Sequence, residues 1–151
     1  MWLLRRMKAS HLEPQIIIDY YIKEIRILAE HGVVLWNCSL TQHQINTLEK
    51  IQKIALKITL GEKYVSYDDA RNQFGLKMLS ERRLDLCTKF ALKLFRSKYC
   101  STFFTLTSSE VATRHRKLVV EANCNTARAY KAPHNYLARL VNQNVDKLNK
   151  K

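Results

Sequence analysis

Apolar residues that recur at intervals of three and four predict a helix over residues 42–60. The positions with this spacing are Ile45, Leu48, Ile51 or Gln52, Ala55 and Ile58. Thr41 and Gln44 form a T-x-x-Q capping box before the first turn, and Gly61 supplies a left-handed cap after the last one. The segment therefore carries both a start signal and a stop signal.

A second helix is expected over residues 14–31. Pro14 is favoured at the first position of a helix, apolar side chains then step by three or four, and Gly32 is a stop signal. The stretch "IIIDYYI" is also compatible with a buried strand, because β-branched and aromatic residues favour strands. Helical spacing and the length of the segment favour the helix.

Two further helices follow along the chain. Ser66 caps a two-turn helix, with Asp68 and Asp69 in its first turn, where carboxylates offset the helix dipole. Ser80 then caps a longer helix over residues 80–97. Its apolar stripe comprises Leu84, Cys87, Phe90, Ala91, Leu94 and Phe95.

The helical period weakens beyond residue 97. The stretch "YCSTFFTLTSS" lacks it, which indicates a loop or an extended segment that packs Phe103 and Phe104 back onto the helices. A final helix is expected from Pro133 to about residue 143.

These elements predict an all-α fold. We expect a small helical bundle over residues 1–97 and an irregular basic C-terminal extension with one short helix over residues 98–151, with about three to five helices in one structural unit. The apolar fraction of 46% is sufficient for a folded core. The expected core comprises Leu48, Ile51, Ala55, Ile58, Leu84, Cys87, Phe90, Ala91 and Leu94.

Net charge narrows the range of partners. The chain has 26 basic and 13 acidic side chains, a formal charge of +13. Residues 1–79 hold 11 basic and 8 acidic side chains, whereas residues 80–151 hold 15 and 5. An excess of this size favours a polyanionic partner, and it lies mainly in the second half of the chain.

Catalytic patterns are missing from the sequence. The five histidines are scattered, and GxSxG, HExxH and glycine-rich phosphate loops do not occur. The four cysteines form no CxxC pair, so free thiols are expected. The nearest approach to a metal pattern has long and uneven gaps and comprises Cys100, His115, Cys124 and His134. We therefore expect no catalytic residue, no metal site and no cofactor.

A membrane partner is also not expected, because the sequence has no run of about 18 apolar residues. The opening "MWLLRRMKASHLEP" places its arginines after a short apolar stretch, which is the reverse of a secretory signal. The chain is therefore expected to be intracellular, in the nucleus or the cytoplasm.

Four stretches of the chain carry a family resemblance: "VVLWNCSLTQHQINTLEKIQKIALKITLG", "YVSYDDA", "ERRLDLCTKFALK" and "TARAYKAPHNYLARLVN". In this order they resemble the C-terminal region of reverse transcriptases (RNA-directed DNA polymerases) from jockey-like non-LTR retrotransposons, a region that follows the polymerase palm. The matching positions are Trp36, Leu40, Thr41, Glu49, Gln52, Lys53, Gly61, Ser66, Tyr67, Ala70, Arg82, Arg83, Cys87, Phe90, Ala91, Lys93, Arg128, Tyr130 and Asn142.

The resemblance implies a tail without the polymerase active site. The Tyr-x-Asp-Asp metal site of the family's palm has no counterpart, because "YDDA" at residues 67–70 aligns with a segment after the palm. Ile27 and Val34 replace two prolines of the family pattern, as in a copy drifting without selection. The chain is thus expected to be a truncated, non-catalytic fragment whose lost partner is the remainder of the reverse transcriptase.

The leading expectation is weak, sequence-tolerant binding of template-primer, element RNA or an RNA–DNA hybrid. The candidate phosphate contacts are Lys50, Lys53, Lys57, Arg82, Arg83, Lys89, Lys93, Arg114, Arg116, Lys117 and Arg128. Trp36 and Tyr64 are weaker stacking candidates, and a buried anchor is the favoured interpretation of Trp36.

Three alternatives stay open. Arg82 and Arg83 begin a helix, where the dipole disfavours cations, so an intramolecular carboxylate is as good a partner for them as a phosphate. The chain as a whole is alternatively a degenerate structural or protein-interaction module that packed against the missing palm. An uncharacterised enzyme is the third class, and no group of residues supports it.

Overall fold

The computed structural model describes residues 1–107, 117–145 and 148. The chain divides into two compact units, which we call unit 1 (Met1–His31 with Thr41–Arg83) and unit 2 (Gly32–Leu40 with Leu84–Lys151). The fold is all-α as expected, and β-pairing in the described residues is limited to one antiparallel bridge between Leu106 and Val119. The expected boundary at residue 97 is wrong, because the second part of the long helix belongs to unit 2.

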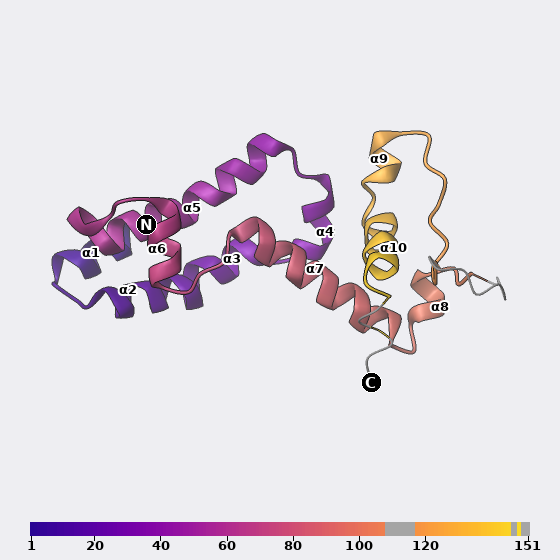
Figure 1. Cartoon of the computed structure of the whole chain (residues 1–151), viewed down its shortest axis with the longest axis horizontal. Helices are drawn as coiled ribbons and strands as arrows, with labels where there is room; N and C mark the ends of the chain where they lie inside the picture. Colours follow the sequence, from indigo (N-terminus) through magenta and orange to yellow (C-terminus); the bar gives the residue numbers. More distant parts are fainter. Residues whose placement is uncertain (108–116, 146–147, 149–151) are drawn as a thin grey trace. The chain divides into compact units, whose positions relative to one another are not determined.

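Unit 1 packs its helices around one long central helix. Its elements are α1 (Trp2–Ala9), α2 (Pro14–Tyr20), the π-helical turn η1 (Tyr21–Ile25), α3 (Arg26–Glu30), α5 (Gln42–Leu60), the 3-10 turn η3 (Gly61–Lys63), α6 (Tyr67–Gln73) and the first turn of α7 (Leu79–Phe95). α1, α2 and α6 each pack against α5 (Figure 1). Helix α1 was not predicted. Its N-cap residue is Met1, which makes no side-chain capping hydrogen bond, so the sequence carries no start signal for this helix.

The ends of α5 largely follow the sequence prediction. Thr41 Oγ1 accepts a hydrogen bond from the Gln44 backbone N–H (3.3 Å), and Gln44 Oε1 accepts one from the Thr41 N–H (2.9 Å). The capping box is therefore confirmed. Gly61 has a φ of 60° but a ψ of −121°, so it ends the helix with a positive φ and not in the expected left-handed helical conformation.

The segment 14–31 is helical throughout and not a strand. α2, η1 and α3 follow one another without a break, and Gly32 ends them with a φ of 63°. The π-helical turn begins at Tyr21, whose side chain is completely buried. A single π turn adds a residue within a helix, so it changes which side chain faces the core at this point.

α5 buries a more polar face than the expected stripe. Its buried residues are Glu49, Gln52, Ala55, Leu56, Thr59 and Leu60. Leu48, Ile51 and Ile58 are only partly buried, and Ile54 is 44% exposed. The buried face is rotated because neighbouring elements offer hydrogen-bonding groups there.

Glu49 and Gln52 hold these groups together. Glu49 Oε1 accepts hydrogen bonds from the Tyr67 hydroxyl and from the backbone N–H of Leu79 (3.1 Å). Gln52 Oε1 accepts from the Tyr21 hydroxyl (3.2 Å), and its Nε2 donates to Tyr67 Oη (2.9 Å) and to the carbonyl oxygen of Lys77 (3.0 Å). Burial raises the pKa of both tyrosines above the ordinary value, so they remain neutral donors. One α5 turn thus fixes η1, α6 and the start of α7.

Unit 2 has a core of its own. Its elements are α4 (Val33–Trp36), the 3-10 turn η2 (Asn37–Ser39), the rest of α7, α8 (Cys100–Phe103), α9 (Ala127–Tyr130) and α10 (Pro133–Gln143). The core residues are Val33, Cys87, Ala91, Phe104, Val119, Leu137, Ala138, Leu140 and Val141. Most of these core residues lie beyond residue 97. This part of the chain is therefore a packed part of unit 2 that includes α8, α9 and α10, and not an irregular extension with one helix.

The predicted stripe of α7 is partly wrong. Cys87 and Ala91 are completely buried, but Leu84 and Phe90 are 47% and 44% exposed. At 3.6 residues per turn, Leu84 and Phe90 lie roughly 60° to either side of Cys87, on the flanks of the buried face. The helix also begins at Leu79, so Ser80 lies inside it and is not the cap.

Asn142 joins the extended segment after residue 116 to α10. Its Oδ1 accepts from the backbone N–H groups of Leu118 (3.0 Å) and Val119 (3.1 Å), and its Nδ2 donates to Val119 O (2.9 Å) and Glu121 Oε1 (2.8 Å). The amide hydrogen bond lowers the pKa of the Glu121 carboxyl. Of the two adjacent phenylalanines, only Phe104 packs inward (4% exposed), while Phe103 is 57% exposed.

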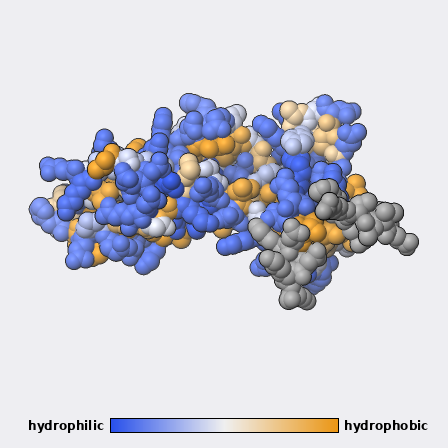
Figure 2. Space-filling view, in the orientation of Figure 1, coloured by the Kyte–Doolittle hydropathy of each residue, from blue (hydrophilic) through white to orange (hydrophobic). Residues whose placement is uncertain are grey.

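Apolar side chains are only partly covered. Polar residues predominate on the face shown in Figure 2, with apolar patches between them. Among the most exposed large apolar side chains are Val65 (84%), Leu28 (78%) and Trp2 (71%).

Truncation of a core residue on α5 should separate buried from exposed positions. Leu56→Ala removes a completely buried side chain, so we expect the free energy of unfolding to fall by about 2–5 kcal/mol. Ile54→Ala, two residues earlier and 44% exposed, is the control and should change it far less. Urea denaturation followed by circular dichroism measures both; equal losses would contradict the observed rotation of the buried face.

Removal of one hydroxyl should test the polar contacts of α5. Tyr67→Phe takes a donor from the buried Glu49 carboxylate and an acceptor from Gln52, and we expect a loss of about 1–3 kcal/mol in unfolding free energy. Tyr64→Phe is the matched control, because Tyr64 is half-buried without a hydroxyl partner among the described residues. A neutral Tyr67→Phe would show that these hydrogen bonds contribute nothing net.

Candidate nucleic-acid interface

The excess of basic side chains in the second half of the sequence lies mainly in unit 2 of the structure. Unit 1 has 13 basic and 9 acidic side chains, and unit 2 has 13 basic and 4 acidic ones. A polyanion is therefore attracted mainly to unit 2.

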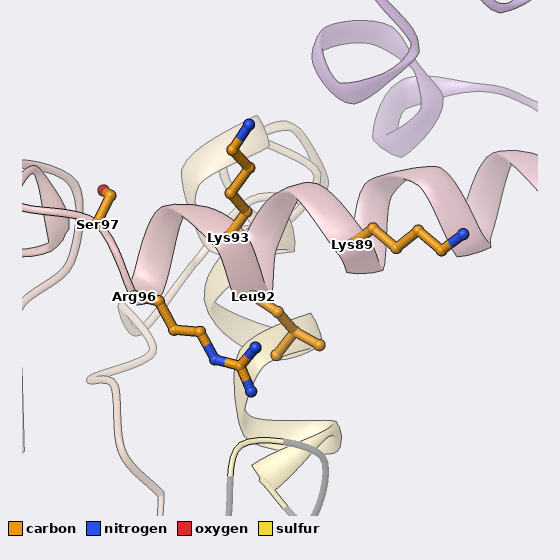
Figure 3. Close-up of a pocket in the computed structure, with 5 residues that line it drawn as sticks. All are labelled: Lys89, Leu92, Lys93, Arg96 and Ser97. Carbon is orange, nitrogen blue, oxygen red and sulfur yellow. The ribbon is translucent and has the colours of Figure 1, made fainter. Parts of the chain in front are cut away.

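Basic side chains follow one another along the second part of α7. Lys89, Lys93 and Arg96 are exposed and succeed each other by four and three positions, so they lie near one another on the helix surface. With Leu92 and Ser97 they line a shallow hollow (Figure 3). Among the described residues, neither Lys89 nor Lys93 has a carboxylate partner, and both ammonium groups are open to a ligand.

The charged groups on α7 spread apart and do not converge on one point. In Figure 3 the Lys93 side chain extends to one side of the helix, and those of Leu92 and Arg96 extend to the other. Lys89 points along the helix toward its N-terminal end. Separated cations suit an extended row of phosphates better than a single small anion.

The lysines of α5 form a second basic row, in unit 1. Lys50, Lys53 and Lys57 are all exposed and share one face, as the sequence predicted. The Lys53 ammonium lies 5.0 Å from the centroid of the Tyr67 ring, a cation–π contact that leaves the charge at the surface.

The arginine pair at the start of α7 is used inside unit 1. Arg82 Nε donates to Glu30 Oε1 at 2.6 Å, so the carboxylate alternative applies to this residue. Arg83 is only 2% exposed and cannot reach a phosphate at the surface. Burial and the nearby Arg82 charge lower the pKa of Arg26, and the Glu30 charge acts against them. Arg83 is therefore removed from the candidate contacts.

The remaining candidates lie in the C-terminal residues. Lys117 is exposed but pairs with Glu121 at 3.3 Å. Arg128 is exposed on α9 and has no partner among the described residues. Arg114 and Arg116 lie outside the described residues.

Sequence reasoning missed a contact between Tyr130 and Arg139. The Arg139 guanidinium carbon lies 3.8 Å from the Tyr130 ring centroid, and its Nη2 donates to the Tyr130 carbonyl oxygen at 2.8 Å. The two residues are nine positions apart across the start of a new helix. No helical or strand period brings such positions together. The signal that the sequence offers is an aromatic residue, Tyr130, between two basic residues, Arg128 and Lys131.

Both weaker stacking candidates are packing residues. Trp36 and Tyr64 are half-buried, Trp36 against the core of unit 2 and Tyr64 against that of unit 1. The favoured interpretation of Trp36 as an anchor agrees with this position.

The adjacent carboxylates of "YDDA" serve the start of α6. Asp68 pairs with Arg71 at 2.7 Å. Ser66 Oγ donates to Asp69 Oδ2 (2.7 Å) and accepts from the Asp69 backbone N–H (3.1 Å). Both contacts are local and typical of a helix N-terminus.

Metal-binding and membrane-spanning features do not occur in the part of the chain that the structure describes. It holds no group of three or more His, Cys, Asp or Glu side chains placed to bind a metal ion. None of its helices combines the length and apolar character needed to cross a membrane.

Comparisons with protein-family models, with curated proteins and with solved structures gave no match. The resemblance to the reverse transcriptase region thus stays an expectation from the sequence. The structure establishes the all-α fold and an exposed basic surface on α7.

Proposed function

We propose that the chain is a non-catalytic nucleic-acid-binding module that contacts the phosphate backbone mainly through unit 2. The observation that carries this proposal is the exposed row of Lys89, Lys93 and Arg96 on a unit with 13 basic and 4 acidic side chains. Exposed lysines without carboxylate partners keep their full charge available to phosphates.

The binding mode follows from the spacing of the charges. Each lysine that neutralises a phosphate releases condensed counterions, and this release supplies most of the affinity. The Lys89, Lys93 and Arg96 side chains point in different directions in Figure 3, so we expect this row to read charge and not sequence. Binding is weak, tolerant of sequence and sensitive to salt.

The sequence resemblance indicates the kind of protein from which such a module derives. The C-terminal region of a jockey-like reverse transcriptase follows the palm, where template-primer or element RNA is the natural ligand. Lys53, Lys93 and Arg128 occupy positions of that resemblance, and all three are exposed here. The proposal therefore names RNA or an RNA–DNA hybrid as the polyanion and the remainder of a reverse transcriptase as a former partner.

A packing module is the second candidate function. Adjacent residues of α3, Ile27 and Leu28, are 57% and 78% exposed, and neighbouring exposed apolar side chains are typical of a protein-contact surface. Sedimentation separates the two functions: concentration-dependent self-association without nucleic-acid binding favours the packing module.

Salt titration tests the phosphate contacts. For about four contacts the log–log slope of affinity against salt should be near −3 to −4, and Lys89→Ala with Lys93→Ala should flatten it by about 1.5. The matched control is Lys23→Ala with Lys63→Ala, which removes two exposed lysines from unit 1. Fluorescence anisotropy with two unrelated RNA sequences measures the slopes. An affinity that hardly changes with salt would exclude the proposed binding mode.

Primer extension tests the absence of catalysis. With a template, a primer, deoxynucleotides and magnesium we expect only background incorporation, because Asp68 and Asp69 are engaged at the start of α6. The double variant Asp68→Asn, Asp69→Asn is the control. Incorporation that this variant abolishes would mean that the two carboxylates hold catalytic metals, contrary to the proposal.

A further inference from the structure

Tyr130 is an exposed aromatic ring held in place by an arginine. It ends α9, and 54% of its surface is exposed. Arg139 on α10 covers part of the ring, with its guanidinium carbon 3.8 Å from the centroid. Stacking of a planar guanidinium on an aromatic ring is favourable and restricts the ring's rotation.

The backbone that carries Tyr130 is fixed on both sides. Asn135, 5% exposed, donates from Nδ2 to the carbonyl oxygen of Ala129 (2.8 Å) and to Cys124 Sγ (3.1 Å). Thr126 Oγ1 accepts from the Ala129 backbone N–H (3.2 Å). Together with the Arg139 contact to the Tyr130 carbonyl oxygen, these bonds set the ring in place before any ligand arrives. A pre-organised ring loses little conformational entropy on binding.

The surroundings of the ring favour a polyanion. Residues 122–145 contain no Asp or Glu, and they contain Arg128, Lys131 and Arg139. Arg128 and Lys131 flank Tyr130 closely in sequence and are exposed. Among the described residues neither has a carboxylate partner. An aromatic ring between unpaired cations is the arrangement with which proteins hold single-stranded nucleic acid.

We propose that Tyr130, backed by Arg139, stacks on an unpaired nucleobase, while Arg128 and Lys131 contact the neighbouring phosphates. The site rests on the proposed function and deepens it, because it names single-stranded nucleic acid as the preferred ligand. A base in a duplex has both faces stacked on its neighbours, whereas an unpaired base has a face for the tyrosine. Preference for unpaired strands thus comes from the ring, and salt dependence comes from the lysine and arginine side chains.

Binding of an unpaired oligouridylate and of a blunt-ended RNA duplex without a loop, compared for a set of Tyr130 variants, tests the site. Tyr130→Leu should weaken oligouridylate binding about tenfold and leave the duplex affinity and the salt slope unchanged. Tyr130→Trp should restore oligouridylate binding, since it keeps an aromatic face. Tyr99→Leu is the matched control, because Tyr99 is 53% exposed with Lys98 over its ring at 5.2 Å.

An abasic oligonucleotide makes the test independent of variant stability. The wild-type chain should bind an abasic strand about as weakly as Tyr130→Leu binds oligouridylate, and thermal unfolding shows whether each variant is folded. Equal losses on both ligands, or no loss with either Tyr130→Leu or the abasic strand, would overturn the stacking site while phosphate binding stands. If the wild-type chain binds neither oligouridylate nor the duplex, the proposed function fails together with the site.

Discussion

Two polar side chains on one turn of α5, Glu49 and Gln52, determine how unit 1 is assembled. Both are buried (7% and 0% exposed), and buried polar groups are stable where hydrogen bonds satisfy them, as they do for Glu49 Oε1 and both polar atoms of Gln52. Glu49 Oε2 is buried without a hydrogen-bond partner among the described residues. Their partners come from η1, α6, Lys77 and the first residue of α7, so each of these elements has to reach the same turn of α5. A purely apolar face would allow α5 to rotate or slide against its neighbours, whereas these hydrogen bonds specify one register.

The extent to which the sequence predicted the fold depends on how local each signal is. Thr41, Gln44 and Ser66 act within one helical turn, and their caps occur as predicted. The burial of Glu49 was not predictable from the same pattern, because its partners are 18 and 30 positions away. The rule that apolar residues form the core therefore predicted a buried face around Leu48 and Ile51, whereas the observed buried face of α5 is centred on Gln52 and Leu56.

The same distinction between local and distant signals applies to the candidate interface. Exposure of Lys50, Lys89 and Lys93 followed from helical periodicity, since a basic face opposite an apolar one remains at the surface. The burial of Arg83 and the stacking of Arg139 on Tyr130 depend on contacts between distant segments. Several residues that carry the family resemblance have packing or hydrogen-bonding roles within the units: Glu49, Gln52 and Cys87 are buried, and Tyr67 and Asn142 are partly buried. The positions behind this resemblance thus describe the internal framework and say little about which surface binds.

The two units are interleaved along the chain, and this affects synthesis. Gly32–Leu40 leaves the ribosome between two parts of unit 1 but belongs to unit 2, whose remaining residues begin at Leu84. During translation, which proceeds at about 5–20 residues per second, the apolar side chains of α4 wait several seconds for α7 and α10. All residues of unit 1 have been synthesised once Arg83 has emerged, so the nascent chain passes through a stage in which unit 1 is complete and the apolar side chains of α4 have no core to join.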